Sequence, residues 1–240
     1  MSNSYTKKNC RLCESKDIKV VLPLQDSPLC DAYLKLPKKQ EFYNLKLCLC
    51  NECNFFQIDT VVDPEVIYRD YIYVTTSSPG LLKHFKTYAL EVCSFLSLDK
   101  SNLTVDIGSN DGTLLGFFKQ HGHNVLGIEP SIKAASGANE SGIKTLPEFF
   151  DKDLANLVVD QYGKASLITI NNLFANIDNL KDFMKSIDVL LDDNGVLVIE
   201  SSYLLDMIDN MVFDFIYHEH LSYFSILPLV RFFKKFDMQL

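Results

Sequence analysis

Val105-Asp106-Ile107-Gly108-Ser109-Asn110-Asp111-Gly112 is the stretch of sequence that decides the fold. A run of strand-forming residues, 103–107, leads into it, and a helical pattern over residues 112–121 follows. The glycines at 108 and 112 let the backbone bend and approach a ligand, because neither carries a Cβ atom. In doubly wound α/β folds such turns lie at the carboxyl ends of strands, where cofactors bind. We therefore predict a cofactor-binding turn.

The residues after this turn alternate between strand-like and helix-like runs. Strands are expected at residues 103–107, 124–129, 143–146, 166–170 and 195–200. Helices are expected at 112–121, after the second strand to about residue 140, at 151–161 and at 180–191. Such alternation predicts an α/β fold, a mostly parallel sheet with helices on both faces.

The glycine spacing separates two classes of cofactor. A dinucleotide fingerprint needs G-x-G-x-x-G, but Asn110 takes the second glycine position and no third glycine follows. The spacing Asp-x-Gly-x-x-x-Gly resembles the first motif of Rossmann-like methyltransferases. Asp106 is placed to meet a cationic ammonium, which S-adenosylmethionine (SAM) carries and a nicotinamide dinucleotide does not. Glu129, which ends the second strand about 20 residues later, suits two ribose hydroxyls. We therefore predict SAM and rank a dehydrogenase far behind.

Two more positions belong to the same predicted edge of the sheet. Phe149 follows the third strand and is placed either to flank an adenine ring or to join the core. Asn171 ends the fourth strand, beneath the expected sulfonium. The full set of predicted cofactor-binding residues is Asp106, Gly108, Ser109, Asn110, Gly112, Glu129, Pro130, Phe149 and Asn171.

The cysteines form a second signal. Six of the seven lie before residue 54, in two C-x-x-C pairs, Cys10/Cys13 and Cys50/Cys53, plus Cys30 and Cys48. Two residues between thiolates let one turn present both sulfurs to one ion, and four thiolates complete a closed, structural zinc site. Cys48 is an alternative ligand, but only Cys50 has the right spacing from Cys53. Free thiols are the competing interpretation.

Composition limits the class of protein. The chain has 240 residues, 47% hydrophobic and 22% charged, enough for one core and a small module. Its net charge of −8 and the absence of a basic stripe exclude a nucleic-acid partner. No apolar run reaches the roughly 18 residues of a membrane span. The N-terminal residues lack the apolar core of a signal peptide, so we expect no membrane partner and a cytoplasmic address. The expected domains are a zinc-binding module (1–62), a helical connector (63–100) and a SAM-binding Rossmann-like domain (101–240).

Taken together, the four cysteines, V-D-I-G-S-N-D-G-T-L-L, G-I-E-P-S and Y-H-E-H-L-S-Y-F resemble the sugar C-methyltransferase family over nearly the whole chain. That resemblance implies SAM-dependent methylation of C3 of a nucleotide-linked 4-keto-deoxysugar. A hydrogen beside a ketone is weakly acidic, and a histidine base suits its removal to give an enolate. By resemblance His220 is the base, with Tyr217 and Glu219 positioning the sugar or shuttling its proton. Tyr73 matches an active-site tyrosine of the family, and His218 is expected to be structural.

The chain departs from the family pattern in two places. Members often carry a histidine after the fourth strand, where this chain has Asn176, and an amide is no base at neutral pH. Members also continue with another α/β domain that helps to bind the nucleotide-sugar, whereas the sequence stops at Leu240. A fragment, a truncated reading frame and half of a split enzyme all remain open, and a partner or the missing domain is expected to complete the substrate site. The alternative functions are a SAM-dependent O-methyltransferase of a sugar or small molecule and a truncated, non-catalytic SAM-binding remnant.

Overall fold

The structure is a computed structural model, and it describes residues 3–30, 34–97 and 101–240. The chain divides into two compact units. The first, here called the thiol-rich unit, comprises Met1–Ile67, Asn172–Lys181 and Glu200–Leu240. The second, the sheet unit, comprises Tyr68–Asn171 and Asp182–Ile199. Each unit is described by itself.

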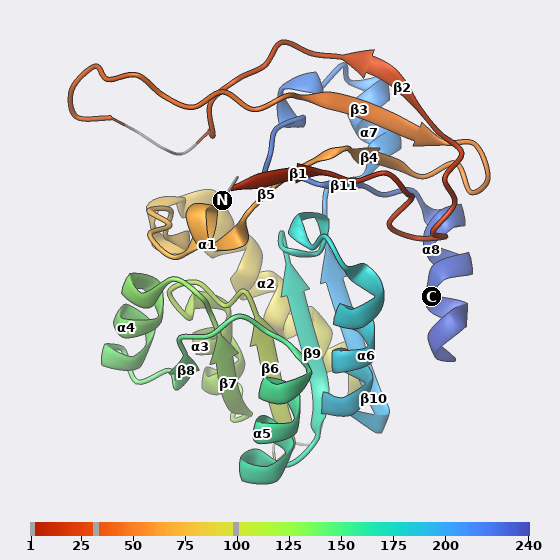
Figure 1. Cartoon of the computed structure of the whole chain (residues 1–240). Coiled ribbons are helices and arrows are strands. Elements are labelled where there is room, and N and C mark those ends of the chain that lie inside the picture. Colours follow the sequence, from red (N-terminus) through yellow and green to blue (C-terminus); the bar gives the residue numbers. More distant parts are fainter. Residues whose placement is uncertain (1–2, 31–33, 98–100) are drawn as a thin grey trace. The chain divides into compact units, whose positions relative to one another are not determined.

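The sheet unit is built on a five-stranded sheet with the order β10-β9-β6-β7-β8 (Figure 1). Its strands are β6 (Leu103–Ile107), β7 (Asn124–Ile128), β8 (Thr145–Leu146), β9 (Ala165–Asn171) and β10 (Leu191–Glu200). β6 pairs in parallel with both β7 and β9, and β7 pairs in parallel with β8. The prediction of a mostly parallel α/β sheet is confirmed.

Helices lie on both faces of this sheet, as predicted. They are α2 (Pro79–Leu96), α3 (Thr113–Gln120), α4 (Ile132–Glu140), α5 (Lys152–Tyr162) and α6 (Leu180–Leu190). Figure 1 shows α5 and α6 in front of the strands and α2 behind them. The central strands β6 and β9 are buried along nearly their whole length, as expected for strands that are covered on both faces.

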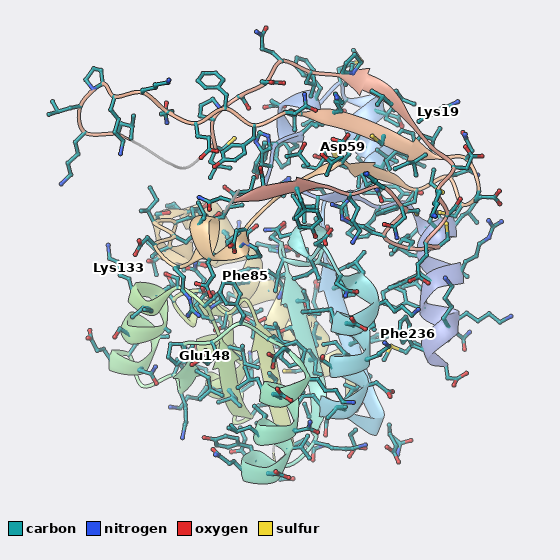
Figure 2. All side chains as sticks on the ribbon, in the orientation of Figure 1. Lys19, Asp59, Phe85, Lys133, Glu148 and Phe236 are labelled. Atoms are coloured by element: carbon teal, nitrogen blue, oxygen red, sulfur yellow. The ribbon has the colours of Figure 1, made fainter. Side chains whose placement is uncertain are left out.

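One apolar cluster joins the helices behind the sheet to its central strands. Phe85 and Ala89 of α2 pack with Leu114 and Phe118 of α3 and with Leu167 of β9. Phe85 is labelled in Figure 2. The cluster therefore fixes α3, the helix that follows the turn after β6, against α2 and β9.

The thiol-rich unit contains two antiparallel sheets. β1 (Ser4–Thr6) pairs with β5 (Thr60–Val62), and a four-stranded sheet has the order β11-β4-β3-β2. Its strands are β2 (Ile18–Pro23), β3 (Lys46–Cys50), β4 (Phe56–Ile58) and β11 (Ser222–Tyr223). The edge strand β11 therefore comes from the far end of the chain and pairs with β4.

Short helices complete the chain. They are α1 (Pro64–Tyr68), α7 (Leu204–Asp209) and α8 (Ile226–Phe233), with the 3-10 helices η1 (Thr75–Ser77), η2 (Phe174–Asn176), η3 (Phe213–Phe215) and η4 (Lys234–Phe236). Among the described residues, no helix combines the length and the apolar character needed to cross a membrane.

Candidate functional site

The turn after β6 is fastened to the end of β7. The backbone N–H groups of Gly108 and Ser109 both donate to the carbonyl oxygen of Ile128, over 2.8 and 3.2 Å. Gly108 has φ +77° and Asn110 has φ +48°, in the left-handed region. Glycine and asparagine are the residues that tolerate this region best, so the sequence suits the turn.

Gly112 is required for a reason that the sequence did not indicate. Its φ is +75°, and a Cβ atom there would lie 3.0 Å from Cγ2 of Ile143 and 3.1 Å from Cβ of Ala138. The missing side chain thus lets the start of α3 pack closely against these two residues.

The carboxylate of Glu129 links the turn to the residues after β7. Its Oε2 accepts the backbone N–H of Asn110 over 2.9 Å, and its Oε1 accepts that of Ser131 over 2.8 Å. Burial raises the pKa of Glu129, and the two N–H donors oppose that shift. Each carboxylate oxygen has a second lone pair, so the group can still accept hydroxyl hydrogens.

Asp106 is a buried carboxyl at the end of β6. It is 3% exposed, and Thr169 Oγ1 donates to its Oδ1 over 2.6 Å. Burial raises the pKa of Asp106 to about 7. A bound cation would favour the ionised form and reverse this shift.

Buried polar atoms without partners lie on the same strand ends. Among the described residues, none hydrogen-bonds to Ser109 Oγ or to the amide Oδ1 of Asn171. Native structures rarely leave such atoms unsatisfied, so these atoms indicate a polar ligand. Together with Asp106, the donor and acceptor set fits SAM, whose amino-acid part is both cationic and anionic.

Asn110 also holds the segment before α2. Its Oδ1 accepts the N–H of Thr75 over 2.9 Å, and its Nδ2 donates to the carbonyl oxygen of Tyr73 over 2.9 Å. The neighbouring Asp111 accepts the N–H of Thr76 over 2.9 Å. Tyr73 is therefore brought beside the cofactor turn, 38% exposed, and burial first and Asp111 second raise its pKa. Neither threonine was predicted from the sequence; the Asn-Asp pair, two side chains that cap nearby backbone, was the available signal.

A cation lies over the predicted adenine-side ring. The guanidinium of Arg69 stands 4.7 Å from the ring centroid of Phe149 and donates over 3.3 Å to the carbonyl oxygens of Pro130 and Pro147. Phe150, by contrast, packs edge-on against Phe183 of α6. Both rings are half-buried, and Phe149 is the one that lies beside Arg69. No local pattern marked Arg69.

The four predicted thiols meet in the thiol-rich unit. The Sγ atoms of Cys10, Cys13, Cys50 and Cys53 all lie within 4.8 Å of one another. The Sγ atoms of Cys10 and Cys53 are 3.5 Å apart, as are those of Cys13 and Cys50. Tetrahedral zinc with Zn–S near 2.3 Å would place sulfurs about 3.8 Å apart, so the cluster fits zinc. Cys48 is outside this cluster, with its Sγ 3.9 Å from the carbonyl oxygen of Lys46.

The two cysteine pairs form the same turn twice. The N–H of Glu14 donates to the carbonyl oxygen of Cys10, and the N–H of Asn54 to that of Cys50, both over 2.9 Å. Glu14 and Asn54 both have positive φ, 65° and 60°. We call residues 10–13 the first zinc knuckle and residues 50–53 the second. The hydrogen bond between the two thiols lowers the pKa of Cys10 and raises the pKa of Cys53, so within this pair Cys10 is the sulfur that ionises first.

His220 and Tyr217 form a hydrogen-bonded pair. His220 Nδ1 is 3.1 Å from the carbonyl oxygen of Phe215, and its Nε2 is 3.1 Å from the Tyr217 hydroxyl. A carbonyl only accepts, so Nδ1 carries the hydrogen and Nε2 presents a lone pair to the hydroxyl. Burial lowers the pKa of His220, which keeps the ring neutral near pH 7.

The other residues of the Y-H-E-H motif are buried. His218 is 1% exposed, its Nε2 is 3.2 Å from the carbonyl oxygen of Asn44, and its ring meets Tyr43 edge-on. These contacts suit a structural histidine. Glu219 is buried as well. Asn176, on η2, has a buried Oδ1 with no hydrogen-bond partner in the described part of the chain.

The predicted residues therefore fall into two sets. In the sheet unit are Tyr73, Asp106, Gly108, Ser109, Asn110, Gly112, Glu129, Pro130, Phe149 and Asn171. In the thiol-rich unit are Cys10, Cys13, Cys50, Cys53, Tyr217, Glu219 and His220.

Two protein-family models match the chain. Methyltransf_13, which describes a zinc binding domain, matches residues 10–68. Methyltransf_23, described as a methyltransferase domain, matches residues 79–240, more than half of the chain. The motif resemblance is confirmed in its zinc-binding module and its methyltransferase domain. With the thiol cluster, the first match supports zinc, and the second supports SAM as the cofactor.

Two relatives show the extent of the similarity. The chain is 28% identical over 233 residues to the C-methyltransferase NovU of Streptomyces niveus, which covers 96% of this chain and 56% of NovU. The chain thus spans about half the length of this curated relative. The solved structure of the plantazolicin methyltransferase BpumL in complex with SAH has a TM-score of 0.53 and 16% identity, and the match covers 65% of this chain and 63% of BpumL. That likeness confirms the fold class.

Proposed function

The chain belongs to the methyltransferase-domain family, and from this premise we propose that it transfers the methyl group of SAM to a carbon atom of a nucleotide-linked 4-keto-deoxysugar. The similarity to a C-methyltransferase supports carbon as the acceptor. The observation that carries the proposal is the neutral His220 with its Nε2 lone pair directed at the Tyr217 hydroxyl. Only methylation at carbon needs a base that removes a hydrogen from carbon.

The sheet unit would hold SAM. Asp106 would receive the ammonium, Glu129 the ribose hydroxyls and Phe149 one side of the adenine, with Asn171 beneath the sulfonium. The buried carboxyl of Asp106 and the buried amide oxygen of Asn171, which has no partner among the described residues, support these roles. When bound, SAM supplies an electrophilic methyl group to which the acceptor carbon bonds.

The Y-H-E-H residues would generate the nucleophilic carbon. The lone pair of His220 Nε2 already accepts the Tyr217 hydroxyl, so we assign Tyr217 as the group that meets the substrate. The hydrogen beside the ketone passes to the Tyr217 oxygen while the hydroxyl hydrogen passes to Nε2. The electron pair of the broken C–H bond stays on the substrate as an enolate, and His220 ends as imidazolium. Tyr73, beside the cofactor turn, and Glu219 are proposed to orient the sugar.

The chain covers about half of the length of NovU. Which residues make up the whole substrate site is therefore also part of the proposal. We propose that a further domain or a partner protein completes the binding of the nucleotide-sugar. The domain limits expected from the sequence, 1–62, 63–100 and 101–240, remain part of this proposal.

Exchange with solvent deuterium tests the proposal. In D₂O, with SAM and a nucleotide-linked 4-keto-deoxysugar, mass spectrometry should find deuterium on the carbon beside the ketone in the unmethylated sugar, and the new methyl group in place of that hydrogen in the product. His220→Asn should reduce both by about 10²–10⁴-fold, the usual contribution of an aligned base, with little change in SAM affinity. His84→Asn, at an exposed histidine of α2, is the matched control.

Two outcomes would contradict the proposal. A loss below tenfold in His220→Asn would remove His220 as the base and direct attention to Glu219. A product methylated on oxygen, with no deuterium at carbon, would establish the O-methyltransferase alternative.

A further inference from the structure

Asp178 receives three hydrogen-bond donors from the N-terminal residues. It lies in the segment 172–181, which follows β9 and belongs to the thiol-rich unit. Its Oδ2 accepts the Tyr5 hydroxyl and, over 3.0 Å, Lys7 Nζ. Its Oδ1 accepts Arg11 Nε over 3.0 Å. Asp178 is therefore held at both carboxylate oxygens.

Arg11 is one of the two residues between the thiols of the first zinc knuckle. Its side chain is 0% exposed, and besides Asp178 it donates from Nη1 to the carbonyl oxygen of Ile58 over 2.7 Å. Its backbone N–H donates to Gln57 Oε1 over 2.9 Å. A buried guanidinium that lost its carboxylate would strongly destabilise the unit. Because Arg11 belongs to the first knuckle, the ion pair with Asp178 links the conformation of the knuckle to the position of Asp178.

The same segment has two more contacts within the thiol-rich unit. Lys181 Nζ lies 3.1 Å from Glu14 Oε2, directly after the first knuckle. The ring of Phe174 stacks on that of Phe224, with centroids 5.1 Å apart. Asn176, whose Oδ1 is buried and unpartnered among the described residues, lies between Phe174 and Asp178 in the chain. Its position therefore depends on these contacts.

We propose that the first zinc knuckle positions segment 172–181 through the Arg11–Asp178 ion pair, and so orients Asn176 toward the methyl acceptor. Zinc bound by Cys10 and Cys13 restricts Arg11, because both neighbouring thiolates are then fixed to one ion. Arg11 and Asp178 are positioning residues in this proposal. The first half of the proposal is that zinc positions segment 172–181. The second half, that Asn176 is thereby oriented toward the methyl acceptor, rests on the proposed function.

Amide hydrogen exchange of the zinc-loaded chain tests the first half. Asp178→Asn removes the charge that pairs with Arg11 and should speed exchange in residues 172–177 about tenfold or more, since breaking a charged hydrogen bond costs at least that equilibrium factor. Its zinc content should stay at one per chain. Asp182→Asn is the matched control, because the carboxylate of Asp182 pairs with the exposed Lys185 over 2.7 Å, and this substitution should leave these amides unchanged.

Zinc removal supplies the second arm. Chelation should speed exchange of the same amides in the wild type. The increase should be clearly smaller in Asp178→Asn, because zinc removal and the substitution both act through the Arg11–Asp178 ion pair. Should Asp178→Asn lose its zinc or its fold, Arg11→Lys carries the test: lysine keeps the charge but cannot bond both Asp178 and the Ile58 carbonyl. Wild-type exchange at 172–177 in a folded variant, or a chelation effect that simply adds to the variant's, would overturn the proposal.

Steady-state kinetics tests the second half. In Asp178→Asn the KM for the nucleotide-linked keto-sugar should rise about tenfold while the KM for SAM stays within about twofold, a split that general destabilisation would not produce. Equal changes in both constants would overturn the link to the acceptor. If the wild-type protein does not methylate the sugar at all, the proposed function fails, and the exchange experiment still decides the role of the knuckle.

Discussion

The backbone N–H of Asn110 donates to Oε2 of Glu129 over 2.9 Å, so the turn after β6 and the end of β7 share one carboxylate. The other oxygen of Glu129 accepts the N–H of Ser131. The side chain expected to bind ribose is therefore also part of the scaffold that shapes the turn.

Glu129→Gln is expected to weaken SAM binding by about 1–3 kcal/mol, although it preserves size. The new amide NH₂ must face an N–H donor, of Asn110 or of Ser131, and a buried donor without an acceptor costs about this much. Titration calorimetry would measure the loss. Glu148→Gln, at an exposed acid labelled in Figure 2, should bind SAM as the wild type does. Equal affinities in the two variants would refute the role of Glu129.

SAM binding is expected to release protons near neutral pH. Burial raises the pKa of Asp106 to about 7, so this carboxyl takes up and releases its proton close to neutral pH in the free protein. An ammonium beside Asp106 favours the ionised form, so affinity should increase as the pH rises through 7 and level off above it. Calorimetry in two buffers of different protonation enthalpy would count the protons. Asp106→Asn should show none, and a wild-type affinity that is independent of pH would count against the contact.

Zinc retention should distinguish two neighbouring cysteines. Cys53→Ser removes one of the four clustered thiols and should release the metal and destabilise the thiol-rich unit. Cys48→Ser changes a buried thiol outside the cluster and should keep one zinc per chain. Elemental analysis of both purified variants provides the measurement. Loss of zinc from Cys48→Ser alone would reverse the ligand assignment.

Two glycines of the same region should respond oppositely to alanine. At Gly112 the positive φ and the 3.0 Å approach of Ile143 disfavour any Cβ, and Gly112→Ala should lower the free energy of unfolding by about 1–3 kcal/mol. At Gly116, inside α3, nothing lies within 4 Å of the added Cβ. Gly116→Ala should raise the free energy of unfolding by about 0.5–1 kcal/mol. Urea denaturation measures both, and a shift of the same sign in each would contradict this reading of the turn.

The pH profile of kcat/KM for the keto-sugar, measured with SAM saturating at every pH, should place the catalytic base. Burial lowers the pKa of His220 below its ordinary 6.5, and the neutral ring is the active form. Activity should therefore be constant around pH 7 and fall only as the pH drops through that lowered value. An acidic limb above pH 7 would instead indicate a different base.

The local patterns of the sequence predicted most of what depends on neighbours in the chain. The two C-x-x-C pairs predicted the thiol cluster because each is a single turn closed by its own backbone, with Glu14 and Asn54 in matching positions. The β6–α3 turn was predicted from Gly108 and Gly112 because it too is a local turn, in which the N–H of Gly112 donates to the carbonyl oxygen of Ser109. The alternation of strands and helices predicted the parallel sheet, since neighbouring parallel strands need a crossover connection, which here is a helix.

Contacts between distant residues were decided only by the tertiary structure. Nothing near Arg11 indicates that it pairs with Asp178, or that Ser222 and Tyr223 add an edge strand to the N-terminal sheet. Arg69 over Phe149 is a further case. A polar side chain or a two-residue strand has many equivalent partners along the sequence. Which one it meets depends on how the apolar clusters of each unit pack, and that packing is a property of the whole fold.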